Sequence, residues 1–310
     1  MNLLWANVNG IDLLLGCVTR IHPMLYRGRE VFQIPRLRSE GVEPLSEDEN
    51  RQFLRHAARV RSMHIRSDQH LRLLKVLPTQ KYMFPRLLSL TWDVPHPNNR
   101  DFQLFLSPTL RHFQVSALHT DMQSIGIHCP ALDHLSIEAS GECTVDEQGL
   151  LRLAETIFSC KQLKHLVCPP LDWAIWNHLS HLPTILKVGI GDYNCTPFKL
   201  ARSNINLNFA PFINLVVLEF SVKTAAYPIA VMKHLEFPAL KDLEVSVSVL
   251  PWAEAEELFR ILSQCRTWHR TLEDIAIFSD DEKLQTSSTN SLTATSQFFC
   301  FAQLRTLAHF

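Results

Sequence analysis

Cys-Pro-Ala-Leu-Asp-His-Leu-Ser-Ile at residues 129–137 returns, with substitutions, as Phe-Pro-Ala-Leu-Lys-Asp-Leu-Glu-Val at residues 237–245. Both stretches contain the pattern Leu-x-x-Leu-x-apolar, with a further apolar residue three positions upstream. Internal repetition decides an architecture before local features do, because each repeat buries its apolar face only by stacking on its neighbours. The two stretches therefore predict a repeat protein.

The same pattern occurs in ten segments along the chain, and each is located by its first leucine-like position. These positions lie 22 to 32 residues apart, at Val60, Leu87, Leu110, Leu132, Leu163, Ile185, Leu215, Leu240, Leu272 and Leu304. Leu-x-x-Leu-x-Leu at such a period is typical of leucine-rich repeats, in which each unit contributes one short strand. Because side chains alternate along a strand, the second leucine and the last apolar residue are expected to point into the core.

Three segments between the expected strands carry helix signals. Capping boxes at 46–49 and 144–147, and a proline at 251, are each followed by apolar residues at helical spacing. The expected apolar faces are Phe53, Leu54, Ala57 and Ala58; Leu150, Leu151, Ala154 and Ile157; and Trp252, Ala255, Leu258, Phe259 and Leu262. Strands that alternate with helices predict an α/β leucine-rich-repeat solenoid, with a parallel sheet on its concave side and helices or turns on its convex side.

The charges of the chain nearly balance, with a net charge of −1 at pH 7 and no block of five like charges. We therefore expect no nucleic acid and no membrane as partner, since both need a concentrated basic surface. The eight cysteines form no C-x-x-C pair, and neither a secretory signal nor an apolar span of about 20 residues is visible. These features predict structural thiols in a reducing compartment, the cytoplasm or the nucleus.

No catalytic motif or phosphate-binding glycine loop is found in the sequence. His178 and His181 have a spacing that suits a metal ligand pair, but no nearby residue completes a ligand set. We therefore expect a protein that is not an enzyme and holds no cofactor or metal. An enzyme with a histidine–metal site is the alternative.

The outward position between the two strand leucines gives the strongest candidate site. It reads Ser62, Ser89, His112, His134, His165, Lys187, Val217, Asp242, Asp274 and Thr306 along the chain. A neighbouring outward column adds His64, Thr91, Gln114, Ser136, Glu219 and Glu244. Strands stacked in this register would place successive members about 4.8 Å apart.

The hypothesis from these columns is a protein-binding concave face. The candidate contact residues are His64, His112, His134, His165, Lys187, Glu219, Asp242, Glu244 and Asp274. Acidic groups of the partner would lie near the histidines, and its basic groups near the carboxylates. The alternative is a solvated strand face, which needs polar residues whether or not anything binds there.

Two regions differ from the array of about ten units that is expected over residues 51–310. Residues 1–50 carry no repeat and are predicted to form an N-terminal helical cap, because an end unit otherwise exposes its core. Residues 279–297 are acidic and then rich in Ser and Thr, which indicates a polar loop. The sequence stops soon after the tenth expected strand, which suggests a fragment or a truncated sequence at this end.

Leu3-Leu4-Trp5-Ala6-Asn7-Val8, followed by leucines 13–15, resembles the last segment of an F-box. The 45–65 stretch and the Phe-Pro-x-Leu-x-x-Leu units resemble the substrate-receptor region of fungal F-box/leucine-rich-repeat proteins. This resemblance implies a substrate receptor of a Skp–cullin–F-box type ubiquitin ligase. Its partners would be a protein substrate on the concave face and, if an F-box lies upstream, the Skp adaptor and a cullin.

The match to the end of an F-box rests on Leu4 and Trp5. The Leu-Pro-x-Glu-type segment that opens an F-box does not precede them, so residues 1–50 would hold only a remnant of that domain. A capping role for Leu4 and Trp5 is an alternative. A stand-alone leucine-rich-repeat scaffold or regulator, with no link to ubiquitin, is the corresponding alternative for the whole chain.

Overall fold

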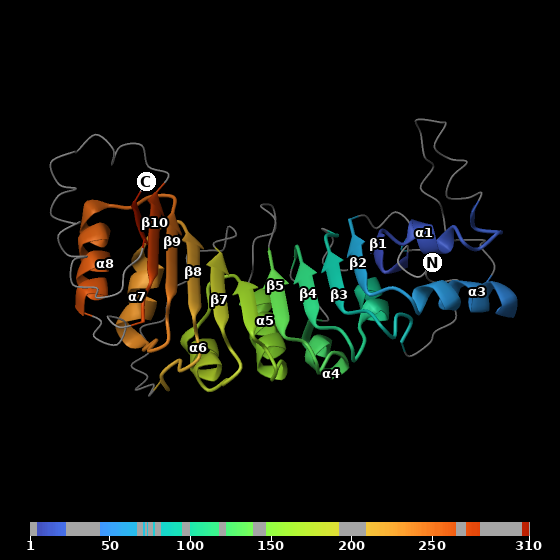
Figure 1. The fold of residues 1–310 in the computed structure, drawn as a ribbon, viewed down its shortest axis with the longest axis horizontal. Coiled ribbons are helices and arrows are strands. Elements are labelled where there is room, and N and C mark those ends of the chain that lie inside the picture. Colours follow the sequence, from blue (N-terminus) through green and yellow to red (C-terminus); the bar gives the residue numbers. More distant parts are fainter. Residues whose placement is uncertain are drawn as a thin grey trace. The chain divides into compact units, whose positions relative to one another are not determined.

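The computed structural model describes residues 5–22, 44–66, 71, 73, 77, 82–94, 100–117, 122–138, 147–191, 209–264, 271–279 and 306–309. The chain divides into two compact units. Unit 1 comprises Met1–Ser140 with Glu147–Lys161, and unit 2 comprises Gly141–Asp146 with Gln162–Phe310. Strands alternate with helices or turns in each unit (Figure 1), and every strand pairing that the structure describes is parallel. The expected α/β class with parallel strands is therefore confirmed.

Unit 1 contains five strands that pair in chain order. They are β1 (Asn7–Asn9), β2 (Ser62–Ile65), β3 (Ser89–Trp92), β4 (His112–Val115) and β5 (His134–Ile137). Its helices, including short 3₁₀ segments labelled η, are α1 (Asp12–Leu15), α3 (Glu47–Ala57), η4 (Arg100–Phe105), η5 (Met122–Ser124), α4 (Ile125–His128) and α5 (Glu147–Ser159).

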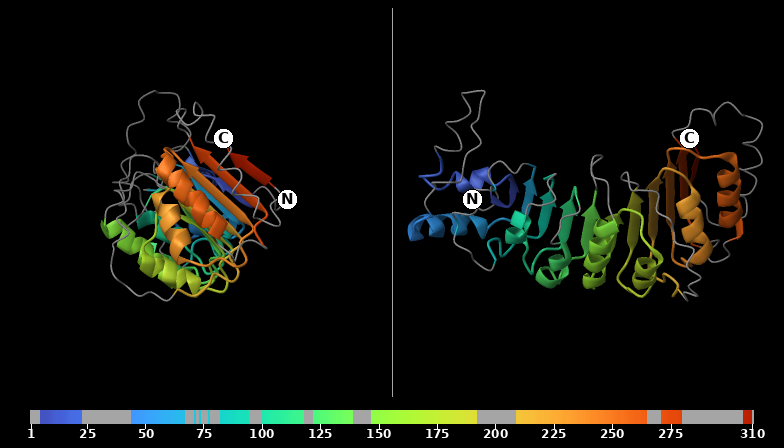
Figure 2. Two further views of the ribbon diagram at one scale, coloured as in Figure 1. Left: turned by 90° about the vertical axis from the view of Figure 1, so that its left-hand side faces the viewer. Right: turned by 180° about the vertical axis from the view of Figure 1, so that it is seen from behind.

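Unit 2 has the same organisation, with its strands again in chain order. They are β6 (His165–Cys168), β7 (Lys187–Gly191), β8 (Val217–Val222), β9 (Asp242–Val247), β10 (Asp274–Ser279) and β11 (Thr306–His309). Its helices are α6 (Trp173–Ser180), α7 (Ala226–His234) and α8 (Trp252–Gln264). These helices lie on one side of the strands and leave the other face of the sheet free of helices (Figure 2).

Burial along the strands follows the predicted alternation. The second and fourth residues of every strand from β2 to β10 are at most 2% exposed. The first leucine-like position of each of these segments is also buried. Apolar burial of this kind contributes about 1.5–3 kcal/mol for each large side chain, so the repeat pattern supplies the core of both units. The tenth segment, at Leu304, lies outside the described residues.

A recurring backbone contact sets the register between successive strands. The carbonyl of Arg61 accepts hydrogen bonds from the N–H groups of Leu88 (2.7 Å) and Ser89 (3.0 Å). The carbonyl of Lys241 accepts the equivalent pair from Glu273 and Asp274. Because the side-chain period of a strand is two, this fixed start decides which residues of each strand face the helices.

The N-terminal segment, which was expected to be a helical cap, also contains a strand. Strand β1 pairs in parallel with β2, with Asn7 opposite Ser62. The carbonyl of Ala6 accepts hydrogen bonds from the N–H groups of both Arg61 and Ser62 at 2.9 Å, as in the later strand pairs. β1 is only three residues long and lacks the repeat pattern, so its sequence gave no signal.

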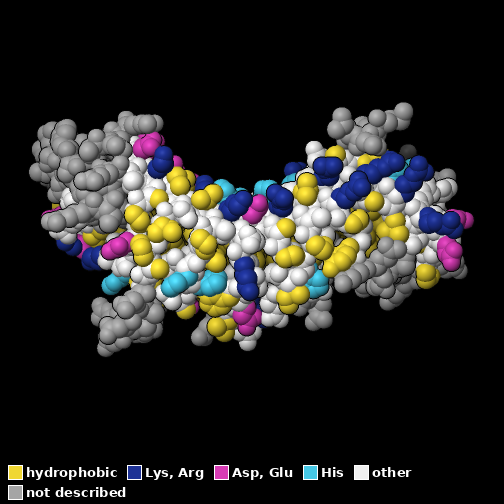
Figure 3. Space-filling model, turned by 60° about the horizontal axis from the view of Figure 1, so that its bottom comes forward, with side chains coloured by type: hydrophobic (Ala, Val, Ile, Leu, Met, Phe, Trp, Pro, Cys, Tyr) yellow, Lys and Arg dark blue, Asp and Glu magenta, His cyan; other side chains and the backbone are white. Residues whose placement is uncertain are grey.

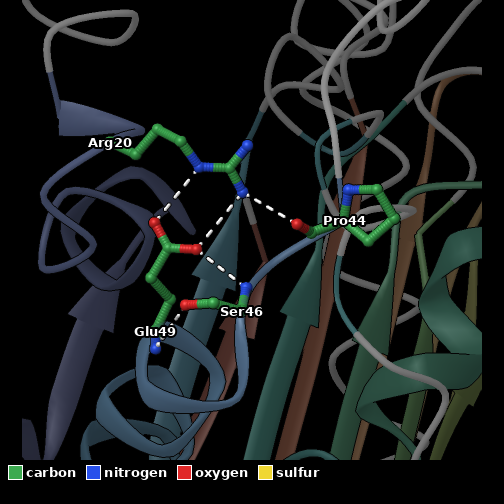
Figure 4. Close-up of polar contacts among 4 residues, drawn as sticks. All are labelled: Arg20, Pro44, Ser46 and Glu49. Atoms are coloured by element: carbon green, nitrogen blue, oxygen red, sulfur yellow. Dashed lines mark hydrogen bonds and ion pairs between the residues drawn. The ribbon is translucent and has the colours of Figure 1, made fainter.

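The start of helix α3 is fixed by the predicted capping box. The Ser46 hydroxyl accepts from the Glu49 N–H at 3.4 Å, and a Glu49 carboxylate oxygen accepts from the Ser46 N–H at 2.8 Å. The Arg20 guanidinium donates to both oxygens of Glu49 and to the Pro44 carbonyl (Figure 4). Arg20 thereby ties this helix start to the chain that follows α1, and its hydrogen bond lowers the pKa of Glu49.

The predicted helices are present, but two of their expected faces are partly wrong. Leu151 on α5 is 61% exposed, whereas Leu153, which was not assigned to the buried face, is fully buried. Trp252, the first residue of α8, is 43% exposed, while the rest of its predicted face is buried. Both errors arise because spacing locates a helical stripe, and only the neighbouring elements decide where the stripe ends. The box at 144–147 lies mostly outside the described residues.

Candidate functional site

The two predicted columns of outward residues stand in register within each unit, and in unit 2 they lie on the helix-free face. We call the first residues of the strands from β2 onward the first column, and the third residues the second column. In unit 1 the pairings run Ser62, Ser89, His112, His134 in the first column and His64, Thr91, Gln114, Ser136 in the second. In unit 2 the first column runs His165, Lys187, Val217, Asp242, Asp274, Thr306. The second column there runs Val167, Gly189, Glu219, Glu244, Ala276. The predicted register is therefore observed within both units.

The histidines of the candidate site are distributed between the units. His112 and His134 lie side by side on β4 and β5 of unit 1, with ring centroids 5.4 Å apart. His64 is on β2 of the same unit, where its Nε2 accepts a hydrogen bond from Arg66 at 3.4 Å. His165 is on β6 of unit 2, beside Lys187. The structure thus brings His112 and His134 together as predicted.

One member of the second column does not face solvent as expected. Ser136 on β5 is 4% exposed, and its hydroxyl donates to a carboxylate oxygen of Glu138 at 3.1 Å. Ser136 therefore contributes little contact area to a partner.

Lys187 and Glu219 form an ion pair across β7 and β8. Lys187 belongs to the first column and Glu219 to the second, so the two columns are linked at this point. Gly189 lies directly opposite Glu219 in register. A Cβ atom at position 189 would be 3.5 Å from a Glu219 carboxylate oxygen, which is ordinary van der Waals contact, and 3.3 Å from Val167.

Asp242 and Asp274 are direct neighbours on β9 and β10. Burial raises the pKa of Asp242 above its ordinary value, and the Asp274 carboxylate beside it raises that pKa further. Glu244 lies two residues along β9 and is exposed. Lys241 is engaged by Glu273 at 3.1 Å, so the nearest described lysine already has an acidic partner. This part of unit 2 therefore concentrates negative charge on the helix-free face.

The described cysteines lack the environment of a reactive nucleophile. Cys129 and Cys160 fill apolar anchor positions and are at most 3% exposed. Burial raises the pKa of Cys129 to about 12 and that of Cys160 to about 11. A thiolate is the reactive form of cysteine, so these thiols behave as packing groups, as predicted.

The histidine pair on α6 has local structural contacts. The Nδ1 atom of His181 lies 2.7 Å from the carbonyl oxygen of Asn177, and burial lowers the pKa of His178. Within the described residues, His, Cys, Asp and Glu side chains form no group of three that could hold a metal ion. In the same part of the chain, none of the helices is both long and apolar enough to cross a membrane.

Neither the known protein-family models nor the curated proteins include a match to this chain. The site is therefore defined by its geometry alone. In each unit, polar and charged side chains are aligned from strand to strand. Unit 1 carries His64, His112 and His134, whereas unit 2 carries His165, Lys187 and a group of acidic side chains. Such an arrangement can make many weak polar contacts with an extended surface.

Four arginines that the two-column pattern did not predict lie next to the columns in unit 1. Arg59 and Arg61 precede β2, Arg86 precedes β3, and Arg111 precedes β4. The signal was present, because each arginine is adjacent to the first leucine-like position of its segment. These positions lie outside the two outward columns on which the site prediction rests.

Proposed function

We propose that the chain is a leucine-rich-repeat solenoid that recognises a protein partner and catalyses no reaction. We further propose that it is the substrate receptor of a Skp–cullin–F-box type ubiquitin ligase, acting in the cytoplasm or nucleus. Parallel strands in chain order, each with the Leu-x-x-Leu-x-apolar burial pattern, support the repeat assignment. Stacked repeats of this kind present extended surfaces that suit protein contacts. The ligase role rests on the resemblance of the N-terminal segment and the repeat units.

The observation that carries the recognition proposal is the acidic pair Asp242 and Asp274 on the helix-free face. Like charges directly opposite each other on adjacent strands destabilise a sheet. Burial and, after it, the Asp274 carboxylate raise the pKa of Asp242, so its ionised form is disfavoured in the folded chain. Basic groups of a partner would relieve the repulsion, so the arrangement favours binding over folding stability.

The substitution Asp242→Asn tests this argument. Because the raised pKa means that ionised Asp242 lowers stability near neutral pH, we expect the melting temperature of the variant to equal or exceed that of the wild type. Capture of protein partners from an extract of the source cells, measured by quantitative mass spectrometry, should fall. Glu256→Gln is the matched control, since it removes an exposed carboxylate from α8 in the same unit. Equal capture by the wild type and Asp242→Asn would contradict a binding role for this face.

The same capture experiment with wild-type protein tests the ligase assignment. Recovery of a Skp adaptor together with a cullin would support a substrate receptor, and the remaining captured proteins would be candidate substrates. Reproducible partners without adaptor or cullin would favour the stand-alone scaffold or regulator.

One observation favours that second candidate function. The Trp5 ring contacts the His56 ring on α3, with centroids 4.5 Å apart, and the adjoining strand β1 pairs with β2. Trp5 and strand β1, which belong to the part of the chain that resembles the end of an F-box, are thus part of the packing of unit 1, as a capping role requires.

A further inference from the structure

Four arginines lie just before strands β2, β3 and β4 of unit 1, and we call Arg59, Arg61, Arg86 and Arg111 the arginine rim. Arg61 and Arg111 occupy the same place in their repeats, one residue before the first column. Arg59 and Arg86 share another equivalent place, one residue before the first leucine-like position. The pairing of β2 with β3 and of β3 with β4 therefore brings all four to one edge of the sheet.

The arginine rim is accessible and its charges are not neutralised. Arg61, Arg86 and Arg111 are exposed and Arg59 is half-buried. In the part of the chain that the structure describes, no ion pair joins any of them to an acidic side chain. Dark-blue basic side chains accordingly form a band over the right-hand, N-terminal part of the molecule in Figure 3. Asp133, the residue that precedes β5, occupies the position equivalent to Arg111 in the next repeat, so the row of arginines ends at Arg111.

The chemistry of the rim favours carboxylate or phosphate groups as ligands. A guanidinium presents its N–H donors in a planar fork that fits two oxygens of either group, whereas a lysine acts as a point charge. The side chains next to the rim on β2–β4 add hydroxyl, amide and imidazole groups, from Ser62, Ser89, Thr91, Gln114 and His112. None of the first- or second-column residues on these three strands is acidic.

The spacing of the rim indicates the form of the ligand. The backbones of Arg61 and Arg111 are separated by two strand spacings, which is about 9.6 Å. A polyproline II chain has three residues per turn and rises about 3.1 Å per residue, so side chains at i and i+3 share a face about 9.3 Å apart. We propose that the arginine rim binds an acidic or phosphorylated protein segment in an extended polyproline II conformation, with anionic side chains three residues apart on Arg61 and Arg111. This inference rests on the proposed role in protein recognition and names the class of partner.

The helix-free face favours a polypeptide over a nucleic acid. Single-stranded nucleic acids bind by stacking their bases on aromatic side chains as well as by charge. The first- and second-column positions of β2–β5 carry no Trp, Tyr or Phe, and the net charge of the whole chain is −1. A short segment with regularly spaced charges matches such a surface better than a continuous polyanion does.

The test measures binding of fluorescein-labelled peptides to the full chain by fluorescence anisotropy near physiological salt. One peptide contains four repeats of Glu-Pro-Pro, and the second has phosphoserine in place of Glu. A third has the composition of the first with its glutamates in one block. The double variant Arg61→Ala/Arg111→Ala is compared with Arg51→Ala/Arg152→Ala, which removes the same charge from α3 and α5 of the same unit. Thermal melting and circular dichroism establish that each variant is folded.

We expect micromolar binding of the Glu or the phosphoserine repeat, and the tighter of the two identifies the anionic group. The rim variant should bind about tenfold more weakly, which corresponds to about 1.4 kcal/mol, while the control variant should bind as the wild type does. The block peptide should also bind more weakly than the repeat. In a charge-swap test, Arg61→Glu/Arg111→Glu should bind a Lys-Pro-Pro repeat that the wild type does not bind.

Three results would overturn the inference. They are no binding of either repeat peptide, equal binding by the rim variant and the wild type, and equally tight binding of a single-stranded oligonucleotide with the same arginine dependence. Partners captured through Asp242 but unaffected by the rim substitutions would remove the rim proposal and leave the recognition proposal standing. If neither Asp242→Asn nor the rim substitutions reduced capture, both the rim proposal and the recognition proposal would be removed.

Discussion

Tyr227→Phe removes one buried hydroxyl that joins two repeats of unit 2. The Tyr227 hydroxyl accepts hydrogen bonds from the Leu171 N–H (2.8 Å) and the Trp176 indole N–H (2.9 Å). It also donates to the Leu171 carbonyl at 2.8 Å. Leu171 and Trp176 are both fully buried, and burial raises the pKa of Tyr227, so the hydroxyl is un-ionised and makes all three bonds. Phenylalanine preserves the ring and its packing.

The expected cost follows from the groups that lose their partner. Two N–H donors and one carbonyl acceptor would remain in an apolar site, and each unsatisfied buried group costs about 1–3 kcal/mol. Small backbone shifts recover part of this, so we expect the free energy of unfolding to fall by about 2–4 kcal/mol. This loss is a large part of the free energy of unfolding of a typical domain, which is about 5–15 kcal/mol.

Urea unfolding followed by tryptophan fluorescence measures this cost, provided the slope of the transition is unchanged. The indole N–H resonance of Trp176 should shift in the NMR spectrum of the variant. Ser221→Ala is the control, because it removes an exposed hydroxyl from β8 in the same unit. A loss below about 0.5 kcal/mol, which is the range expected for surface substitutions, would refute the argument that these hydrogen bonds hold α7 to the chain between β6 and α6.

Two further predictions concern packing and charge. Gly126→Ala should lower the free energy of unfolding by about 1–3 kcal/mol in chemical denaturation, because its Cβ would clash with the Ser159 side chain. Adding Ser159→Gly should recover part of this loss, and no recovery would place the strain elsewhere. The second concerns Glu257, whose pKa is lowered to about 2 by hydrogen bonds from Arg260 and Lys233. A lowered carboxylate pKa stabilises the fold above the unfolded value of 4.5 and ceases to do so as the pH falls through 2. Glu257→Gln should therefore melt below the wild type at pH 7, and the two melting temperatures should converge between pH 4.5 and 2.

Much of the fold could be predicted because its signal is local and repeated. Val60 and Leu240, nearly 200 residues apart in sequence, occupy the same place in their segments and are both fully buried. A pattern of period two determines which face of a strand is apolar, and its recurrence determines which residues stand beside each other in the sheet. The register of His112 with His134 and of Asp242 with Asp274 followed from the sequence for this reason.

The details of the candidate site could be predicted only in part, because they depend on the reach of individual side chains. Nothing in the sequence joins Lys187 to Glu219, 32 residues away, yet the pairing of β7 with β8 brings the two side chains together as an ion pair. The arginine rim likewise forms only when β2, β3 and β4 are paired.

The sequence by itself determined the α/β class, the positions of the repeat strands β2–β10, and the polar residues in their outward positions. The tertiary structure decided that Leu153 rather than Leu151 is buried on α5, that residues Asn7–Asn9 form a strand, and that Tyr227 bonds to Leu171. The physical reason is the range of the interactions. Alternation and capping act over a few residues and are written in local patterns, whereas packing and long-range hydrogen bonds depend on neighbours that only the folded chain brings together.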